Sequence, residues 1–184
     1  MAHESFEHVQ DDGKLWDEFE RTFGFRPNRQ RGAGPAIDEP PGSVTIDLSP
    51  IFGARDHAEF DAGAKQVDQL VLQSFQRVFD DTTKLLVLDW QHPSYRFRPH
   101  GIIEATRWPQ WPVTPFPDGD YHVFLTEDMS QGTFGHPWEQ TLCVFGNDLV
   151  DDLVPTLPFP ITRRQPRIVS ITSGDRSGAD SDTE

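Results

Sequence analysis

Two histidines in this chain stand directly before prolines, and each has a carboxylate and a tryptophan close by in the sequence. The two segments are Asp89-Trp90-Gln91-His92-Pro93 and His136-Pro137-Trp138-Glu139. A residue that precedes proline is pushed toward extended backbone geometry, so each histidine should point in a fixed direction. If the segments meet in the fold, their imidazoles and carboxylates could hold zinc or a similar ion; the candidate ligands are His92, His136, Asp89 and Glu139.

The spacing of these groups matches no established metal-binding pattern such as H-E-x-x-H. The sequence therefore favours a structural interpretation, in which the histidines cap turns and the acids accept hydrogen bonds from backbone amides. On this interpretation we expect no metal, no cofactor and no catalytic residue.

Tryptophans and arginines gather in and around the same segments. Aromatic side chains in proline-rich loops can line a binding groove or fill the end of a sheet; here they are Trp90, Tyr95, Trp108, Trp111 and Trp138. Nearby arginines could pair with the acids around Glu139 or bind an anionic ligand; they are Arg96, Arg98 and Arg107. The candidate binding cluster comprises Trp90, His92, Arg96, His136, Trp138 and Glu139.

Other catalytic arrangements find little support in the sequence. Cys143 and His136 could form a thiol nucleophile and base, but Cys143 sits within an apolar run, where cysteine usually behaves as a small buried hydrophobe. The glycines at 132 and 135 are not followed by the Lys-Ser/Thr pair of a phosphate-binding loop, and no G-x-S-x-G motif occurs.

The elements that must position these residues can be read from hydrophobic periodicity. Helical spacing predicts a first helix between Asp12 and Gly24, a long helix over about 56–80 with a capping box at its start, and a short helix between Asn147 and Pro155. Alternating or continuous apolar runs predict strands at 43–48, 85–90, 121–126, 132–136 and 140–145. The fold class is therefore α+β: an antiparallel meander of about five strands, with the long helix and two shorter helices packed mainly on one face.

Composition divides the chain into three parts. Residues 1–10 are polar and are expected to form a flexible arm, and residues 11–162 are expected to form a single α+β domain. Residues 163–184 are rich in Arg, Ser, Gly and Asp and are expected to be a disordered, dispensable tail.

The net charge of the chain indicates which classes of partner it favours. The net charge is −14, and the stretch from Tyr121 to Thr162 holds six acids and no Lys or Arg. Such a field repels nucleic acid and anionic membranes, suits solubility, and would attract a basic protein partner. With one cysteine, no signal peptide and no long apolar run, the expected address is the cytoplasm.

Several motifs together resemble a known family. They are Phe23-Gly-Phe-Arg-Pro27, the strand at 43–48, the segment from Leu88 to Phe97, Gly119-Asp-Tyr121 and, above all, the segment GTFGHPWEQTLCVFG at 132–146. These motifs resemble the bacterial family called domain of unknown function 2716, over about residues 15–153. The resemblance implies a single bacterial domain in the cytoplasm, and it carries over no activity, cofactor or catalytic residue.

Two functions remain open from the sequence. The first is a non-enzymatic protein-binding module, such as an immunity protein that neutralises a toxin, because the chain is acidic and compact and lacks a catalytic motif. The alternative is a small metal-assisted hydrolase that uses His92, His136 and Glu139.

Overall fold

The computed structural model of the protein describes residues 5–103 and 111–168. In these residues the chain forms one sheet of eight strands in the order β1-β4-β3-β5-β6-β7-β2-β8, and every neighbouring pair is antiparallel. The expected α+β class with an antiparallel sheet is confirmed. The expected number of about five strands is wrong, because three short strands extend the sheet.

The strands are short, and only β3-β4 and β5-β6-β7 follow one another closely along the chain. Their bounds are Phe6–His8 (β1), Val44–Asp47 (β2), Leu85–Asp89 (β3), Tyr95–Phe97 (β4), His122–Leu125 (β5), Gly132–His136 (β6), Thr141–Phe145 (β7) and Ile161–Arg164 (β8). The meander β5-β6-β7 is the one that its short connections predict. The strands that the sequence did not predict are β1, β4 and β8.

The three predicted helices, α1, α3 and α4, begin and end largely where the sequence signals place them, and α2 was not predicted. Their bounds are Gly13–Phe23 (α1), Ser49–Phe52 (α2), His57–Val78 (α3) and Asn147–Leu153 (α4), with 3₁₀ turns at Pro99–Gly101 and Val154–Thr156. The Asp56 carboxylate accepts a hydrogen bond from the Glu59 N–H, at 2.9 Å, and so caps α3. Gly24 ends α1 in the left-handed conformation, with φ of 57°.

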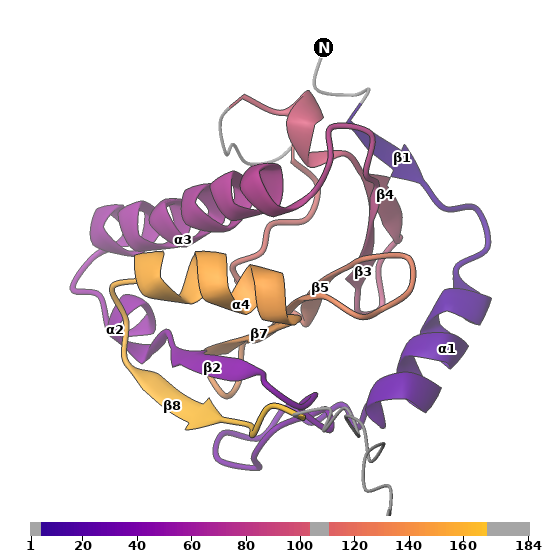
Figure 1. Ribbon diagram of the computed structural model, residues 1–184. Coiled ribbons are helices and arrows are strands. Elements are labelled where there is room, and N and C mark those ends of the chain that lie inside the picture. Colours follow the sequence, from indigo (N-terminus) through magenta and orange to yellow (C-terminus); the bar gives the residue numbers. More distant parts are fainter. Residues whose placement is uncertain (1–4, 104–110, 169–184) are drawn as a thin grey trace, which may run out of the picture.

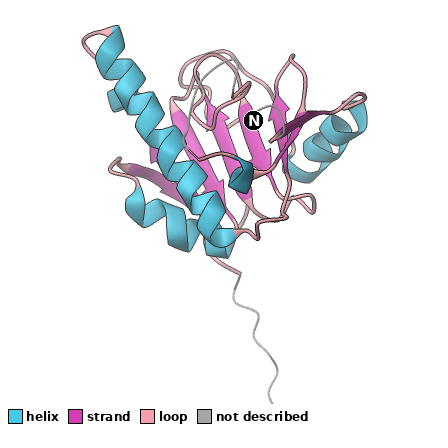
Figure 2. Ribbon diagram, turned by 90° about the horizontal axis from the view of Figure 1, so that it is seen from above, coloured by secondary structure: helices cyan, strands magenta, loops and turns pink. Residues whose placement is uncertain are grey.

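Core side chains cover both faces of the sheet. Residues of α2, α3 and α4 share one buried cluster with one set of strand side chains, whereas Phe19 and Phe23 of α1 share another with the opposite set. The alternation is clear in β3, where Leu85 and Val87 belong to the first cluster and Leu86 and Leu88 to the second. Figure 1 shows α3 and α4 side by side on one side of the strands and α1 on the other, and Figure 2 shows α3 crossing the sheet.

Both ends of the domain differ from expectation. The expected flexible arm includes β1, which pairs with β4 at one edge of the sheet. The expected tail includes Arg163 and Arg164 of β8, which pairs with β2 at the other edge. Residues 165–168 also contact the domain, since the Gln165 N–H donates to the Ser43 carbonyl and the Gly42 N–H donates to the Pro166 carbonyl. The rest of the expected tail, residues 169–184, lies outside the described residues.

Candidate functional site

The two His-Pro segments leave the sheet at the same end. Asp89 is the last residue of β3 and lies opposite His122, the first residue of β5. His136 is the last residue of β6 and lies opposite Thr141, the first residue of β7. The 89–92 turn and the 137–140 hairpin loop therefore project from one end of neighbouring strands.

The sheet nevertheless separates the side chains of this end onto its two faces. Successive side chains of a strand point to opposite faces. Asp89 and His122 lie on the same face of the sheet as Val87 and Phe124, which is the face toward α3. His136 lies on the face of Phe134, which is the face toward α1. The end of the sheet thus carries two distinct groups of polar and aromatic residues.

On the α1 side, aromatic rings form a compact cluster. The ring centroids of Trp90 and Trp138 are 6.3 Å apart, and those of Tyr121 and Trp138 are 5.0 Å apart. The Tyr121 hydroxyl donates to the Asn28 carbonyl, at 2.7 Å, and accepts from the Asn28 N–H, at 2.8 Å. The Arg29 guanidinium lies over the Trp90 ring, 4.9 Å from its centroid. The structure thus brings the two predicted tryptophans together.

His136 belongs to this cluster and has a structural role. It is 2 % exposed, and its Nδ1 accepts a hydrogen bond from the Glu139 N–H, at 3.1 Å. Accepting at Nδ1 places the proton of the neutral ring on Nε2. Burial lowers the pKa of His136, and the charge of Glu139 opposes this shift only in part. A neutral, buried ring that caps a turn matches the structural interpretation of this histidine.

The Glu139 side chain forms an ion pair with an arginine. Its carboxylate binds the Arg163 guanidinium through two bonds of 2.7 and 2.9 Å, and Arg163 also binds Glu39. Burial opposes ionisation of Glu39, but hydrogen bonds from Arg163, Thr45 and Gln165 outweigh it and lower the pKa of Glu39. This bridge fastens β8 to the hairpin loop that carries Glu139.

Two further predicted residues lie apart from the aromatic cluster. Arg96 is opposite Leu86 in the ladder, toward the other end of the sheet, and its Nε lies 3.4 Å from the Glu127 carboxylate. His92 lies on the other side of the 89–92 turn, with Asp89. The set proposed from sequence as metal ligands divides into two pairs in the described residues: His92 with Asp89, and His136 with Glu139. Only the first pair belongs to a group whose side-chain atoms could share an ion.

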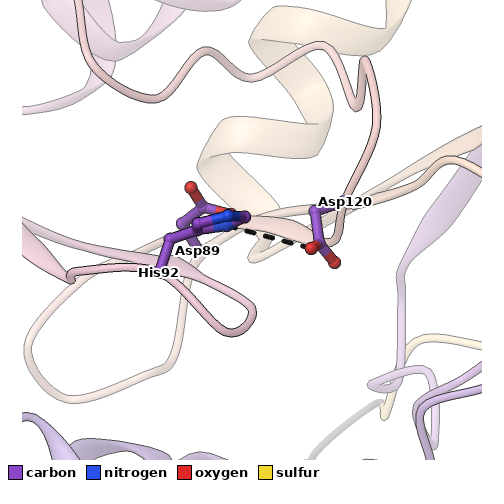
Figure 3. A group of neighbouring side chains, drawn as sticks. All are labelled: Asp89, His92 and Asp120. Atoms are coloured by element: carbon purple, nitrogen blue, oxygen red, sulfur yellow. Dashed lines mark hydrogen bonds and ion pairs between the residues drawn. The ribbon is translucent and has the colours of Figure 1, made fainter.

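The α3 side of the same end carries a group that the sequence did not predict. His92 Nδ1 lies 3.2 Å from the Asp89 carboxylate and 3.9 Å from that of Asp120 (Figure 3). The atoms that Asp89, His92 and Asp120 could offer to a metal ion all lie within 4.8 Å of one another. His122 Nε2 lies 3.9 Å from both the Asp89 and the Asp118 carboxylates.

Hydrogen bonds to two backbone carbonyls fix the orientation of the His122 ring. Its Nδ1 lies 2.8 Å from the Thr114 carbonyl and 3.0 Å from the Phe116 carbonyl, so Nδ1 carries the proton and donates it. The Asp68 carboxylate of α3 holds this segment by accepting from the Phe116 N–H, at 2.7 Å. His122 therefore presents the unprotonated Nε2 to the acidic group whenever the ring is neutral.

Gly135 makes room for this arrangement. It lies opposite His122 in the ladder, and a Cβ there would come within 3.0 Å of the Pro117 side chain and 3.1 Å of the Pro115 carbonyl. The missing side chain lets residues 114–117 pass close over the end of the sheet. That close passage places the two carbonyl acceptors against the His122 ring.

Each group borders a recess. The α3-side recess has a volume of about 500 Å³ and is lined by Asp89, His92, Trp111, Pro112, Thr114, Asp118, Gly119, Asp120 and His122. The α1-side recess has a volume of about 550 Å³ and is lined by Asp12, Trp16, Glu20, Phe25, Pro27, Trp90, Gln91 and His92. His92 borders both, because the 89–92 turn forms the wall between them. Gln91 in this turn has a φ of 68°, an uncommon conformation for a residue other than glycine.

The pKa of Asp89, in the α3-side recess, is raised above its usual value. Burial raises its pKa, the charges of His122 and His92 lower it, and the charge of Asp120 raises it again. Cys143, by contrast, is fully buried, and burial raises its pKa to about 12. A thiol with such a pKa does not supply a nucleophilic thiolate at neutral pH.

The chain was also compared with known proteins. The model of a family described as "Protein of unknown function (DUF2716)" matches residues 6–150. This chain belongs to that family. The chain is 28 % identical over 138 residues to "Uncharacterized protein YxiI" of Bacillus subtilis (strain 168), covering 75 % of this chain and 84 % of the relative. No solved structure gives a significant match.

All described residues that line the two recesses fall within the part matched by the DUF2716 model. Strand β8, with Arg163, lies beyond it. Within the described residues, no helix has both the length and the apolar character that crossing a bilayer requires.

Proposed function

We propose that this DUF2716 domain is a non-enzymatic binding protein of the bacterial cytoplasm, and that it recognises cationic side chains of a basic protein partner at the end of its sheet. One observation carries the proposal. The described residues that line the two recesses include three carboxylates on the α3 side, two on the α1 side, and no Lys or Arg.

The α1-side recess has the composition that a cationic side chain favours. Asp12 and Glu20 supply negative charge, and Trp16, Phe25 and Trp90 supply aromatic surface. A guanidinium is attracted both to a carboxylate and to an aromatic face. Within the protein, Arg29 already rests on Trp90, which illustrates the preference of this surface.

The charge of the whole chain supports the same class of partner. A net charge of −14 accelerates encounter with a basic protein and disfavours nucleic acid. An immunity role, in which the partner is a basic toxin, fits this chemistry. The metal-assisted hydrolase that uses His92, His136 and Glu139 fits less well, because Glu139 binds Arg163 and His136 caps a turn.

The experiment compares two double variants, one at the N-cap residue Asp12 and Glu20 of α1 and one within α1 alone. Asp12→Asn/Glu20→Gln removes the charge of the recess, whereas Asp17→Asn/Glu18→Gln removes two charges from exposed residues of the same helix that do not line it. Binding of a hexa-arginine peptide is measured by calorimetry, with a hexa-glutamate peptide as the negative control. We expect the first variant to weaken hexa-arginine binding at least about tenfold, and the second to weaken it much less.

Affinity capture from the native host then tests the biological partner. A basic protein that the wild type and Asp17→Asn/Glu18→Gln retain, and that Asp12→Asn/Glu20→Gln loses, supports the proposal. Equal weakening by both double variants would show that net charge alone drives binding and would contradict a specific recess.

A further inference from the structure

The α3-side recess carries a second inference that does not depend on a protein partner. We propose that Asp89, His92 and Asp120 form a binding site for one divalent transition-metal ion, of the class that includes Zn²⁺, and that His122 joins as a fourth ligand when its ring moves toward the ion.

The donor set has the right chemistry for such an ion. Imidazole nitrogen combined with carboxylate oxygen suits zinc and its neighbours in the transition series, whereas magnesium and calcium prefer oxygen alone. The site offers nitrogen from His92 and His122 and oxygen from Asp89 and Asp120. Asp118, whose carboxylate lies 3.9 Å from His122 Nε2, stands beside them.

His122 gives the observation that separates this site from a common acidic patch. Its side chain is 8 % exposed, it lines the recess, and its Nε2 makes no hydrogen bond within the described residues. Because Nδ1 donates to the Thr114 and Phe116 carbonyls, the Nε2 lone pair of the neutral ring is directed toward the Asp89 and Asp118 carboxylates. A buried lone pair that faces negative charge is unfavourable, and either a proton on Nε2 or a metal cation between the groups removes the conflict.

The hydrogen bonds that His122 donates through Nδ1 are of the kind that metal-binding histidines make. Such histidines donate the other ring N–H to a backbone carbonyl or a carboxylate, which fixes the tautomer and orients the ligand nitrogen. Here two carbonyls play this part, and Asp68 and Gly135 hold in place the segment that carries them.

The ligand atoms of Asp89, His92 and Asp120 can share an ion after a small contraction, because all lie within 4.8 Å of one another. His122 is outside this group and must move farther to join it. Two ligand atoms that each lie about 2.1 Å from one ion are roughly 3–4 Å apart, according to their angle. His92 Nδ1 lies 3.2 Å from Asp89 and 3.9 Å from Asp120, and His122 Nε2 lies 3.9 Å from Asp89. His92 stands on an exposed turn, so its ring can adjust.

The test uses the full chain, freed of metal with a chelator and then dialysed. Zn²⁺, Co²⁺, Mn²⁺ and Mg²⁺ are titrated in turn by calorimetry and by thermal unfolding. We expect one equivalent of Zn²⁺ or Co²⁺ to bind and to raise the unfolding temperature by roughly 5–10 °C at a hundredfold excess over the dissociation constant. Bound Co²⁺ should show visible ligand-field absorption without a thiolate charge-transfer band, because Cys143 is buried elsewhere.

The variants assign the site. His92→Ala removes an exposed ligand and Asp120→Asn a half-buried one, and each should weaken Zn²⁺ binding at least about tenfold. His57→Ala, which removes an exposed histidine at the start of α3, is the matched control and should leave binding unchanged. His122→Gln is added only if circular dichroism shows that it folds.

Three results would overturn the proposal: no Zn²⁺ or Co²⁺ binding below about 1 mM, equal effects of His57→Ala and His92→Ala, or stabilisation by Mg²⁺ as strong as by Zn²⁺. The last result would indicate an acidic patch in which the imidazoles take no part. Hexa-arginine binding is scored separately on variants of α1, so failure of the metal site leaves the protein-binding proposal to be judged on its own.

Discussion

At the scale of single residues, two histidines at one end of the sheet have opposite tautomers. His122 donates through Nδ1 to backbone carbonyls, and His136 accepts at Nδ1 from the Glu139 N–H. One ring therefore keeps its free nitrogen for the recess, and the other is used to close a turn. The residue type alone does not distinguish these roles, because the partner of Nδ1 decides them.

Nitrogen-15 spectra of the imidazoles should show this difference. When each ring is neutral, we expect His122 as the Nδ1–H form and His136 as the Nε2–H form, each recognised by its long-range proton–nitrogen couplings. His122→Gln or His136→Ala assigns each signal. The same tautomer on both rings would contradict the hydrogen bonds described above.

The lowered pKa of His136 also predicts how its contribution to stability changes with pH. The unfolded chain binds a proton at this position below about pH 6.5, whereas the folded protein resists protonation until lower pH. The contribution of neutral His136 is therefore complete above pH 6.5 and is lost as pH falls toward the folded pKa.

Urea unfolding of His136→Ala at several pH values measures this effect. The variant should lose about 1–3 kcal/mol at pH 7.5, because the Glu139 N–H is left without its acceptor. It should also show a weaker decline of stability below pH 6.5 than the wild type. His57→Ala should follow the wild-type curve, and a parallel decline in His136→Ala would assign the pH dependence to other groups.

At the scale of elements, one ion-paired arginine fastens β8 to the sheet. Arg163 bridges Glu39, whose side chain is 3 % exposed, and Glu139, whose side chain is 15 % exposed. Burial opposes the charge of Arg163, but its two carboxylate partners outweigh that effect and raise its pKa. The strand itself is mostly exposed, so this bridge is its main anchor besides the backbone ladder.

Removing Arg163 should therefore destabilise the protein strongly. Arg163→Ala leaves the Glu39 charge buried without a counter-charge, and we expect a loss of about 3 kcal/mol in urea unfolding. Arg164→Ala, an exposed residue of the same strand, should change stability by less than about 0.5 kcal/mol. The double variant Glu39→Gln/Arg163→Met should lose less than Arg163→Ala; a greater loss would show that packing, rather than the charge, is decisive.

Gly135 offers a second test at this scale. Gly135→Ala would press on Pro117 and the Pro115 carbonyl and should cost about 1–3 kcal/mol. Gly119→Ala is the control, because a Cβ added at this glycine would meet nothing within 4 Å. Equal stability of the two variants would show that the 114–117 segment yields without cost.

At the scale of the whole molecule, strands from both ends of the chain form the outer edges of the sheet. β1 pairs with β4 at one edge, and β8 pairs with β2 at the other. The Arg167 guanidinium forms an ion pair with Asp151 near α4, so the contacts continue beyond β8. We therefore expect the dispensable part of the C-terminus to begin after residue 168.

Two truncations measure this boundary. Removal of residues 169–184, whose composition is polar, should shift the unfolding temperature by less than about 3 °C. Removal of residues 161–184 also deletes β8 and the Arg163 bridge, and it should lower the unfolding temperature by roughly 6–12 °C. Similar unfolding temperatures of the two truncations would show that β8 contributes little.

The sequence by itself determined the elements with strong local signals. Periodicity and the Asp56 cap defined α3, and short connections between apolar runs defined the β5-β6-β7 meander. These features depend on residues close together in the chain, so local patterns suffice. The two His-Pro motifs, each after an apolar run, also indicated segments that leave the sheet at one end.

Only the tertiary structure decided the edge strands and the composition of the site. β1, β4 and β8 are only three or four residues long, too short for a clear alternating pattern. β1 and β8 also depend on pairing with strands that are distant in the sequence. The site depends on the register that sets Asp89 opposite His122, residues far apart in the sequence, and on the alternation that sends His136 to the other face. Register and face are properties of the assembled sheet, because a one-residue shift would exchange the faces of every side chain.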